Sequence, residues 1–133
     1  MSYLLDTDVF SVAARDNCEP LRERLGQVPW RDLALSAITA GEIEFGLARH
    51  RPTARVFERL QLLRATIQVM DLNDSVAREY GRLRHLLAQA GTPIGPNDVW
   101  IAAHALTEKR TLVTGNEREF RRVPGLLVEN WMR

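Results

Sequence analysis

Four acidic side chains, widely spaced in the sequence, should come together at one edge of a folded sheet. Asp6 ends the apolar run Tyr3–Leu5, and Glu42 follows a second apolar run by a few residues. Asp98 opens an apolar helix, and Glu119 comes after another short apolar run. Carboxylates brought together repel one another and raise each other's pKa, and a divalent cation removes that conflict. The spacing therefore predicts that these four acids surround a metal ion.

The types of ligand determine which ion the site would bind. Clustered carboxylates favour the hard cations Mg²⁺ and Mn²⁺, and the chain offers no cysteine pair or spaced histidine pair for zinc. We expect Asp6 and Asp98 to be the principal metal ligands and catalytic residues. Glu42 and Glu119 should complete the set, directly or through water. A metal held in this way activates a water molecule and stabilises the charge that develops on a phosphate.

Polar side chains beside these acids should orient them. The hydroxyls of Thr7 and Thr114 and the amide of Asn116 can hold a ligand or a phosphate in place. Asp8 is expected to bond backbone groups of its own turn rather than the ion. We therefore predict that these four residues support the site without ligating the metal.

Several of the acids also have a purely structural explanation. Asp6 and Asp8 could cap the helix that follows the first strand. Thr39 stands three residues before Glu42, the spacing of a capping box, in which case Glu42 belongs to the first turn of a helix. Asp98 lies in a first helical turn, where any acid gains from the helix dipole. The metal site is favoured only by the convergence of all four acids.

The remaining acids are less informative. Glu119 could be a plain surface acid between basic neighbours, and Glu44 and Glu117 are predicted to lie on the surface. These interpretations stay open at the level of sequence.

The elements that must position the site follow from the hydrophobic pattern. Short apolar runs typical of buried strands occupy residues 3–5, 33–37, 67–72, 111–114 and 126–129. Helical spacing, or apolar character on all sides, marks residues 19–28, 39–48, 53–65, 74–90 and 96–106. This alternation predicts an α/β fold with a central parallel sheet of about five strands and helices on both faces. Ligands of such sheets bind at the carboxyl ends of the strands, where the acids fall.

Length and composition set further limits. The 133 residues suit one domain that spans residues 1–133. The apolar runs are too short to cross a membrane, and the single cysteine, Cys18, cannot form an internal disulfide, so we expect a cytoplasmic protein. Of the 18 basic residues only Lys109 is a lysine. The planar fork of arginine suits phosphate and favours a nucleic-acid partner, although a GC-rich genome explains the same bias.

Several short motifs match a known family in their order along the chain. They are Tyr3–Asp8 (YLLDTD), Ile38–Ile43 (ITAGEI) with Gly46-Leu47, Ile94–Asp98 (IGPND) running into Ile101–Ala105 (IAAHA), Leu112–Asn116 (LVTGN), Glu119-Phe120 and Val123–Leu126 (VPGL). On these residues the chain resembles the PIN-domain ribonucleases, and in particular the VapC-type toxins of toxin–antitoxin pairs. The combination is specific, whereas any single motif would be weak.

The resemblance implies a single three-layer PIN domain that acts as a Mg²⁺- or Mn²⁺-dependent endoribonuclease. Asp6, Glu42 and Asp98 match the three family acids, while Asn116 and Glu119 share the less regular fourth position. The resemblance also implies a homodimer and a cognate antitoxin that inhibits the toxin, binds DNA and directs a basic side chain toward the acids. The RNA cleaved by such toxins is often structured, such as an initiator tRNA.

Two groups of residues are candidates for these partners. The phosphates of RNA would be gripped by arginines near the acids, for which position suggests Arg15, Arg49, Arg51 and Arg82. The apolar candidates for antitoxin contacts are Trp30, Phe45, Leu47, Phe57 and Leu60. Three histidines could donate protons, namely His50, His85 and His104, although His104 on the apolar helix is better explained as a satisfied core residue.

Two other functions compete with the nuclease. A haloacid-dehalogenase-like phosphatase also ends its first strand in Asp-x-Asp, so Asp6 would attack phosphorus and Asp8 would protonate the leaving group. The chain is short for that family, and Lys109 precedes a strand instead of following one. The other alternative is a non-catalytic module that binds RNA or protein, in which the acids are only helix caps.

Overall fold

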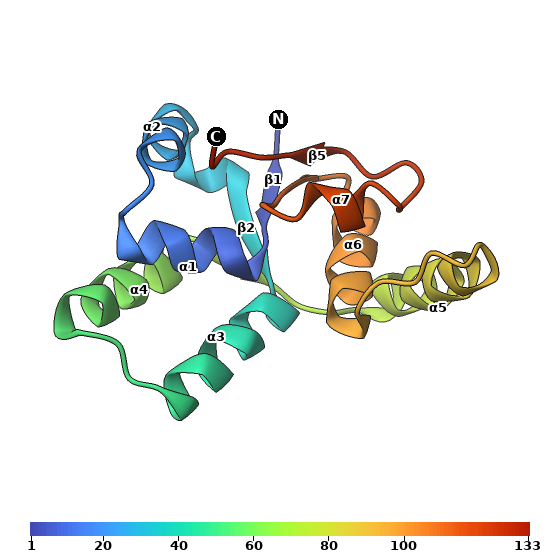
Figure 1. Cartoon of the computed structure of the whole chain (residues 1–133), viewed down its shortest axis with the longest axis horizontal. Coiled ribbons are helices and arrows are strands. Elements are labelled where there is room, and N and C mark those ends of the chain that lie inside the picture. The colour runs from blue at the N-terminus through green and yellow to red at the C-terminus, as the bar shows by residue number, and fades with distance from the viewer.

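A five-stranded parallel sheet forms the centre of the molecule (Figure 1). The computed structural model describes residues 1–133. The strands are β1 (Tyr3–Leu5), β2 (Leu33–Ser36), β3 (Gln68–Met70), β4 (Thr111–Val113) and β5 (Val128–Glu129), and their order in the sheet is β3-β2-β1-β4-β5. Every neighbouring pair is parallel, so all carboxyl ends lie at one edge. The predicted α/β fold is confirmed.

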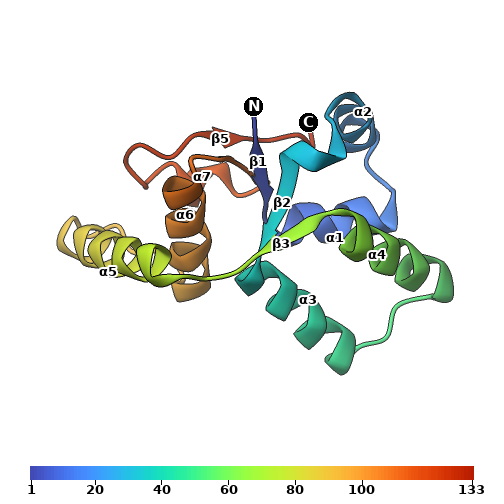
Figure 2. The same cartoon turned by 180° about the vertical axis from the view of Figure 1, so that it is seen from behind.

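Helices cover both faces of the sheet and give three layers. The helices are α1 (Thr7–Arg15), α2 (Glu19–Gln27), α3 (Ala37–Arg49), α4 (Ala54–Thr66), α5 (Asp74–Gln89), α6 (Pro96–Glu108) and α7 (Glu117–Phe120), with a 3₁₀ turn at Trp30–Asp32. Figures 1 and 2 show α1, α2 and α4 on one side of β1 and β2, and α5 and α6 on the other. No helix is long and apolar enough to cross a membrane.

The side chains of β1 explain how one strand serves two cores. Tyr3 and Leu5 belong to the core on the α1, α2 and α4 side, and Leu4 belongs to the core beneath α5 and α6. Successive residues of a strand point to opposite faces, and both faces of this strand are covered. This explains why Tyr3–Leu5 is an unbroken buried run. It fixes β1, and hence Asp6 just beyond it, in the middle of the sheet.

Two helices and the length of the edge strands differ from the sequence-based expectation. α1 starts at Thr7, directly after the strand, and was not predicted; the four-residue helix α7 was also missed. β3 is shorter than residues 67–72, and most of it is exposed at the edge of the sheet. β5 comprises only Val128 and Glu129. An edge strand has a hydrogen-bonded neighbour on one side only. Its pairing therefore ends before the apolar run in the sequence does, and the hydrophobic pattern overestimates the length of the strand.

The start of α3 also differs. Ser36, at the end of β2, is the N-cap, and its hydroxyl accepts the backbone N–H of Ile38. Thr39 is therefore already inside the helix, and the predicted capping box with Glu42 is wrong. Glu42 lies in the second turn instead of the first. The end of α5 is as predicted, because Gly91 takes the left-handed conformation with φ of +71°.

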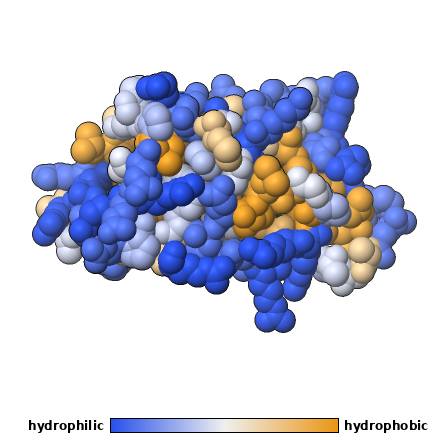
Figure 3. All heavy atoms as spheres, turned by 90° about the horizontal axis from the view of Figure 1, so that it is seen from above, coloured by the Kyte–Doolittle hydropathy of each residue, from blue (hydrophilic) through white to orange (hydrophobic).

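Exposed large hydrophobic side chains are few. They are Met1, Trp30, Phe45, Leu62, Val69 and Leu127. One face of the molecule is mostly hydrophilic, with a larger apolar patch right of centre and smaller apolar groups at the upper left (Figure 3). Of the five apolar candidates for antitoxin contacts, Trp30 and Phe45 are more than half exposed, whereas Leu60 is buried in the core beneath α4.

Candidate active site

Asp6 lies at the junction of β1, α1 and β4. Its backbone N–H donates to the carbonyl of Val113, and its Oδ1 accepts the backbone N–H of Val9 at 3.0 Å. Its Oδ2 accepts the hydroxyl of Thr114. The residue is 5% exposed. Asp6 is therefore both the N-cap of α1 and a buried carboxylate at the sheet edge, so the two sequence interpretations of this acid are compatible.

Glu42 joins three helices at the same edge. Its Oε1 accepts the hydroxyl of Thr7 on α1 at 2.5 Å, and its Oε2 lies 3.5 Å from the amide nitrogen of Asn97 on α6. The hydroxyl of Thr7 also lies 3.4 Å from that of Thr39. Thr7 thus hydrogen-bonds one of the predicted acids. Asn97 was missed, although it directly precedes Asp98.

The pKa values of Asp98 and Asp6 are both raised by their surroundings. Burial, followed by the negative charges of Glu119, Glu42 and Asp8, raises the pKa of Asp98 from 3.8 to about 6. Burial also raises the pKa of Asp6 to about 6 against the opposing hydrogen bonds of Thr114 and Val9, and the charges of Asp8 and Asp98 add to the rise. Acids from α1, α3, α6 and α7 therefore act on one another electrostatically.

The fourth acid is tied to the first through a short chain of hydrogen bonds. The side-chain amide of Asn116 donates to Glu119 Oε2, and the backbone N–H of Asn116 donates to Thr114 Oγ1 at 2.9 Å. Thr114 in turn donates to Asp6. Thr114 and Asn116 thus orient two of the acids. Asp8 is exposed on the first turn of α1, and the backbone bond expected of it is made by Asp6 instead.

The fit of a metal ion to these residues can be judged from their chemistry. All four acids supply oxygen atoms, and Asp98 is affected only by burial and by other negative charges, with no hydrogen bond to stabilise its charged form. No three of the Asp, Glu, His and Cys side chains stand in an arrangement that could hold a metal ion. The donor set suits a hard divalent cation, but the acids do not form a preformed metal cage.

A groove of about 450 Å³ opens between α1, α3 and α4 and reaches Glu42. One wall is the α1 stripe of Thr7, Ser11 and Arg15. The apolar part of the lining comes from Ile43, Leu47, Val56 and Leu60. The buried Leu60 thus contributes to the groove while belonging to the core. The groove therefore places apolar surface next to Glu42.

The candidate RNA-binding arginines differ in their surroundings. Arg15 lines the groove that contains Glu42. The guanidinium carbon of Arg49 lies 5.1 Å from the centre of the Phe45 ring, and that of Arg51 lies 4.8 Å from the centre of the Phe57 ring. Arg82, in contrast, forms an ion pair with Glu79 on its own helix, so it is not a free phosphate grip.

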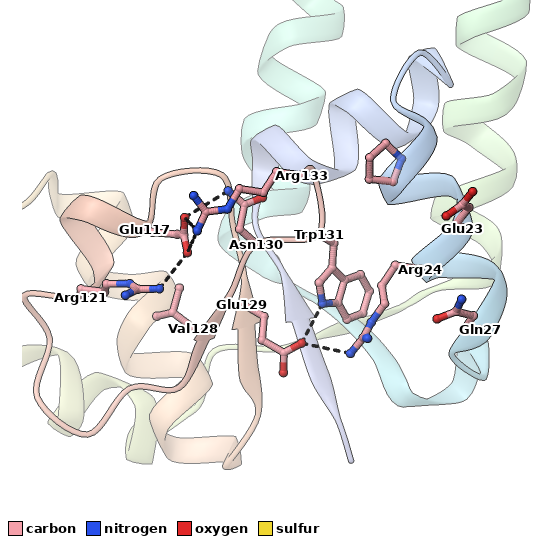
Figure 4. Close-up of a pocket in the computed structure, with 11 residues that line it drawn as sticks. Glu23, Arg24, Gln27, Glu117, Arg121, Val128, Glu129, Asn130, Trp131 and Arg133 are labelled. Carbon is pink, nitrogen blue, oxygen red and sulfur yellow. Dashed lines mark hydrogen bonds and ion pairs between the residues drawn. The ribbon is translucent and has the colours of Figure 1, made fainter.

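Glu117 is not the plain surface acid that the sequence suggests. It forms ion pairs with Arg121 and Arg133, each at 2.8 Å, and accepts a hydrogen bond from Asn130 at 3.3 Å (Figure 4). These contacts attach the C-terminal segment to α7, the helix that carries Glu119. No local sequence pattern signals this cluster, because its members are up to 16 residues apart.

Comparison with known proteins identifies the family. The PIN-domain model matches residues 3–126. The chain belongs to the PIN-domain family. The "Ribonuclease VapC2" of Rickettsia felis is 33% identical to this PIN domain over 132 residues, which is 98% of each chain. The "tRNA(fMet)-specific endonuclease VapC" of Salmonella typhimurium is 32% identical over 131 residues, again 98% of each chain.

Solved structures agree with these relatives. VapBC2 from Rickettsia felis, bound to a DNA fragment from its promoter, contains a chain with a TM-score of 0.89 and 32% identity to this PIN domain, covering 98% of it and 99% of that chain. DNA-bound VapBC from Salmonella typhimurium gives the same TM-score and identity, with 98% of each chain covered. The expected resemblance to VapC-type PIN domains is confirmed. The comparisons favour the nuclease over the phosphatase and over the non-catalytic module.

Proposed function

We propose that this PIN domain is a divalent-metal-dependent endoribonuclease and the toxin of a toxin–antitoxin pair. The observation that carries the proposal is the meeting of Asp6, Glu42, Asp98 and Glu119 at one sheet edge, in a chain that is 33% identical to a VapC ribonuclease. Burial and the mutual repulsion of these charges raise the pKa of Asp6 and of Asp98 to about 6. Acids with raised pKa values gathered at one sheet edge are typical of functional sites, and a cation would compensate their charges.

Each acid has a role that follows from its contacts. Asp6, held by Val9 and Thr114, is a rigid ligand, and Asp98, without a hydrogen bond, is free to turn toward a cation. Glu42 and Glu119 complete the site directly or through water. Bound Mg²⁺ or Mn²⁺ would supply a water molecule activated for attack and a positive charge for the phosphodiester.

The substrate is RNA, and its phosphates would meet the arginines around the acids. Arg15 lies in the groove beside Glu42, and Arg49 and Arg51 lie next to aromatic rings near the same helix. The Salmonella typhimurium relative is named for cleavage of tRNA(fMet). We propose that a structured RNA of this kind, met in the cytoplasm, is the substrate.

The partner is an antitoxin that occupies the groove between α1, α3 and α4. The related chains were solved as VapBC complexes bound to DNA. An antitoxin segment with apolar side chains would cover Ile43, Leu47 and Val56, and a basic side chain at its end would neutralise the acids in place of the metal. The toxin itself is proposed to be a homodimer.

The test is RNA cleavage by purified protein with Mn²⁺. Asp6→Asn and Asp98→Asn should each abolish cleavage while the chain stays folded, because each removes a metal ligand. Asp8→Asn is the matched control, since Asp8 is exposed and is assigned no metal. Full cleavage by either ligand variant would contradict the proposal. Loss in Asp8→Asn together with phosphatase activity in the wild type would favour the haloacid-dehalogenase chemistry.

A further inference from the structure

A buried histidine on α6, the helix that carries Asp98, faces the start of α3, the helix that carries Glu42. His104 is on α6, as is Asp98, and it is fully buried. Its Nδ1 lies 2.8 Å from Oγ of Ser36, which is also fully buried at the end of β2. Its Nε2 has no hydrogen-bond partner. An unpaired buried nitrogen is costly, so an apolar residue would suit this interior better unless the bond at Nδ1 has a purpose.

The hydrogen bond is made to the N-cap of the helix that carries Glu42. Ser36 caps α3, and its Oγ accepts the backbone N–H of Ile38 at 3.1 Å. A hydroxyl has one donor and two acceptor positions, so that of Ser36 can cap the helix and hydrogen-bond His104 at the same time. Burial lowers the pKa of His104, and either tautomer of the neutral ring can make the bond. The histidine therefore fixes the rotamer of the α3 cap.

The same face of α6 meets α3 at a second point. Asn97 is seven residues, or about two helical turns, before His104 and so lies on the same side of α6. Its side-chain nitrogen is 3.5 Å from Glu42 Oε2. The two helices are thus joined in the interior by His104 and Ser36, and at the rim by Asn97 and Glu42.

We infer that His104 is a positioning residue that sets the separation of Glu42 and Asp98 by holding Ser36 at the start of α3. It touches neither metal nor RNA. The inference rests on the proposed metal site, because a defined separation of the two carboxylates matters only when both serve one cation. A partner hydrogen-bonded directly to a metal ligand typically changes metal affinity or activity tenfold to a hundredfold when it is removed. His104 acts one step further out, through the cap of α3, so we expect a loss at the lower end of that range.

The test measures the Mn²⁺ dissociation constant by calorimetry, alongside melting temperatures in EDTA. His104→Leu should weaken Mn²⁺ binding about tenfold. His104→Asn, whose amide can occupy the Nδ1 position, should restore most of the affinity. Leu87→Ala is the control, because Leu87 is fully buried on α5 and its side chain cannot hydrogen-bond Ser36. It should lower the melting temperature and leave the Mn²⁺ affinity unchanged.

A second pair of variants isolates the bond itself. Ser36→Ala should weaken binding, and adding His104→Leu should weaken it little further, because both changes break one link. If His104→Leu does not fold, Ser36→Ala and His104→Asn give the same comparison. If His104→Leu or Ser36→Ala binds Mn²⁺ as tightly as the wild type, or if Leu87→Ala loses as much Mn²⁺ affinity as they do, the inference about His104 is wrong. The proposed function would be unaffected by either result. A wild-type protein that binds no Mn²⁺ would overturn the proposed function as well.

Discussion

Neutralising Asp6 should stabilise the metal-free protein. Burial, opposed by the hydrogen bonds of Thr114 and Val9 and reinforced by the charges of Asp8 and Asp98, raises the pKa of Asp6 from 3.8 to about 6. A group with a raised pKa binds more protons in the folded state than in the unfolded state. The metal-free protein therefore loses stability as pH rises through the interval from 3.8 to about 6, and the whole penalty is present above it.

The magnitude follows from that interval. A pKa that moves from 3.8 to about 6 corresponds to about 3 kcal/mol of lost stability at neutral pH. Asp6→Asn removes the charge and keeps the shape. Its amide oxygen still accepts the N–H of Val9, and its nitrogen can donate to the Thr114 hydroxyl oxygen. The hydroxyl proton of Thr114 then loses its acceptor, which costs about 1 kcal/mol. We expect a net gain of about 2 kcal/mol, or a rise in melting temperature of about 5–8 °C.

The assay is thermal unfolding in EDTA at pH 7.5 and at pH 4.5. At pH 4.5 only about 1 kcal/mol of the penalty remains, because the pH is then less than one unit above 3.8. The weakened contact with Thr114 offsets that remainder, so the net gain from Asp6→Asn should disappear. Asp8→Asn serves as the control and should give a smaller change, since Asp8 is exposed. A lower melting temperature of Asp6→Asn at pH 7.5, or an equal rise at both pH values, would refute the argument that its charge destabilises the fold.

Three further predictions concern the support of the site, the substrate and the partner. Thr114→Val removes the hydroxyl that donates to Asp6, so RNA cleavage at saturating Mn²⁺ should slow at least about tenfold; an unchanged rate would contradict this role. Arg15→Ala should raise KM for RNA with little effect on kcat, and should reduce the dependence of KM on salt, measured in steady-state assays over a salt series. An unchanged salt dependence of KM would show that Arg15 does not bind an RNA phosphate. Leu47→Glu places a charge on the apolar groove and should weaken antitoxin binding by more than about tenfold while free-toxin cleavage persists; tight inhibition of this variant in a titration would place the antitoxin elsewhere.

The sequence was sufficient for the sheet because the signals there are local, and the metal-binding role of the acids stays a prediction. Tyr3–Leu5 is apolar on both faces and is followed at once by Asp6, and that combination is typical of a central parallel strand. Parallel strands then bring distant acids to one edge without any knowledge of side-chain packing. The parallel sheet and its helical layers are confirmed, and Asp98 responds electrostatically to Glu119 and Glu42.

The errors arise where local signals are ambiguous. α1 begins at Thr7 with no linker after the strand, so the polar residues of its first turn resemble a loop. Ser36 and Thr39 are both good capping residues, and the strand end selects Ser36. Sequence patterns describe neighbours along the chain, and they do not report how far a strand continues at the sheet edge.

Contacts across long sequence separations could not be predicted. His104 and Ser36 are 68 residues apart, and the hydrogen bond between them depends on how α6 packs on β2. The sequence suggested a satisfied core histidine, but only Nδ1 has a partner. Glu117 likewise meets Arg133 only because the C-terminal segment returns to α7.

The most direct test of the account is a calorimetric titration of Mn²⁺ into metal-free protein at pH 7.5, with the wild type and an Asp6→Asn/Asp98→Asn double variant compared at equal concentration. We predict saturable binding to the wild type and none above background to the double variant, with both proteins folded by circular dichroism. Equal binding to the two proteins, or no binding to the wild type, would contradict the claim that these acids converge to hold a cation.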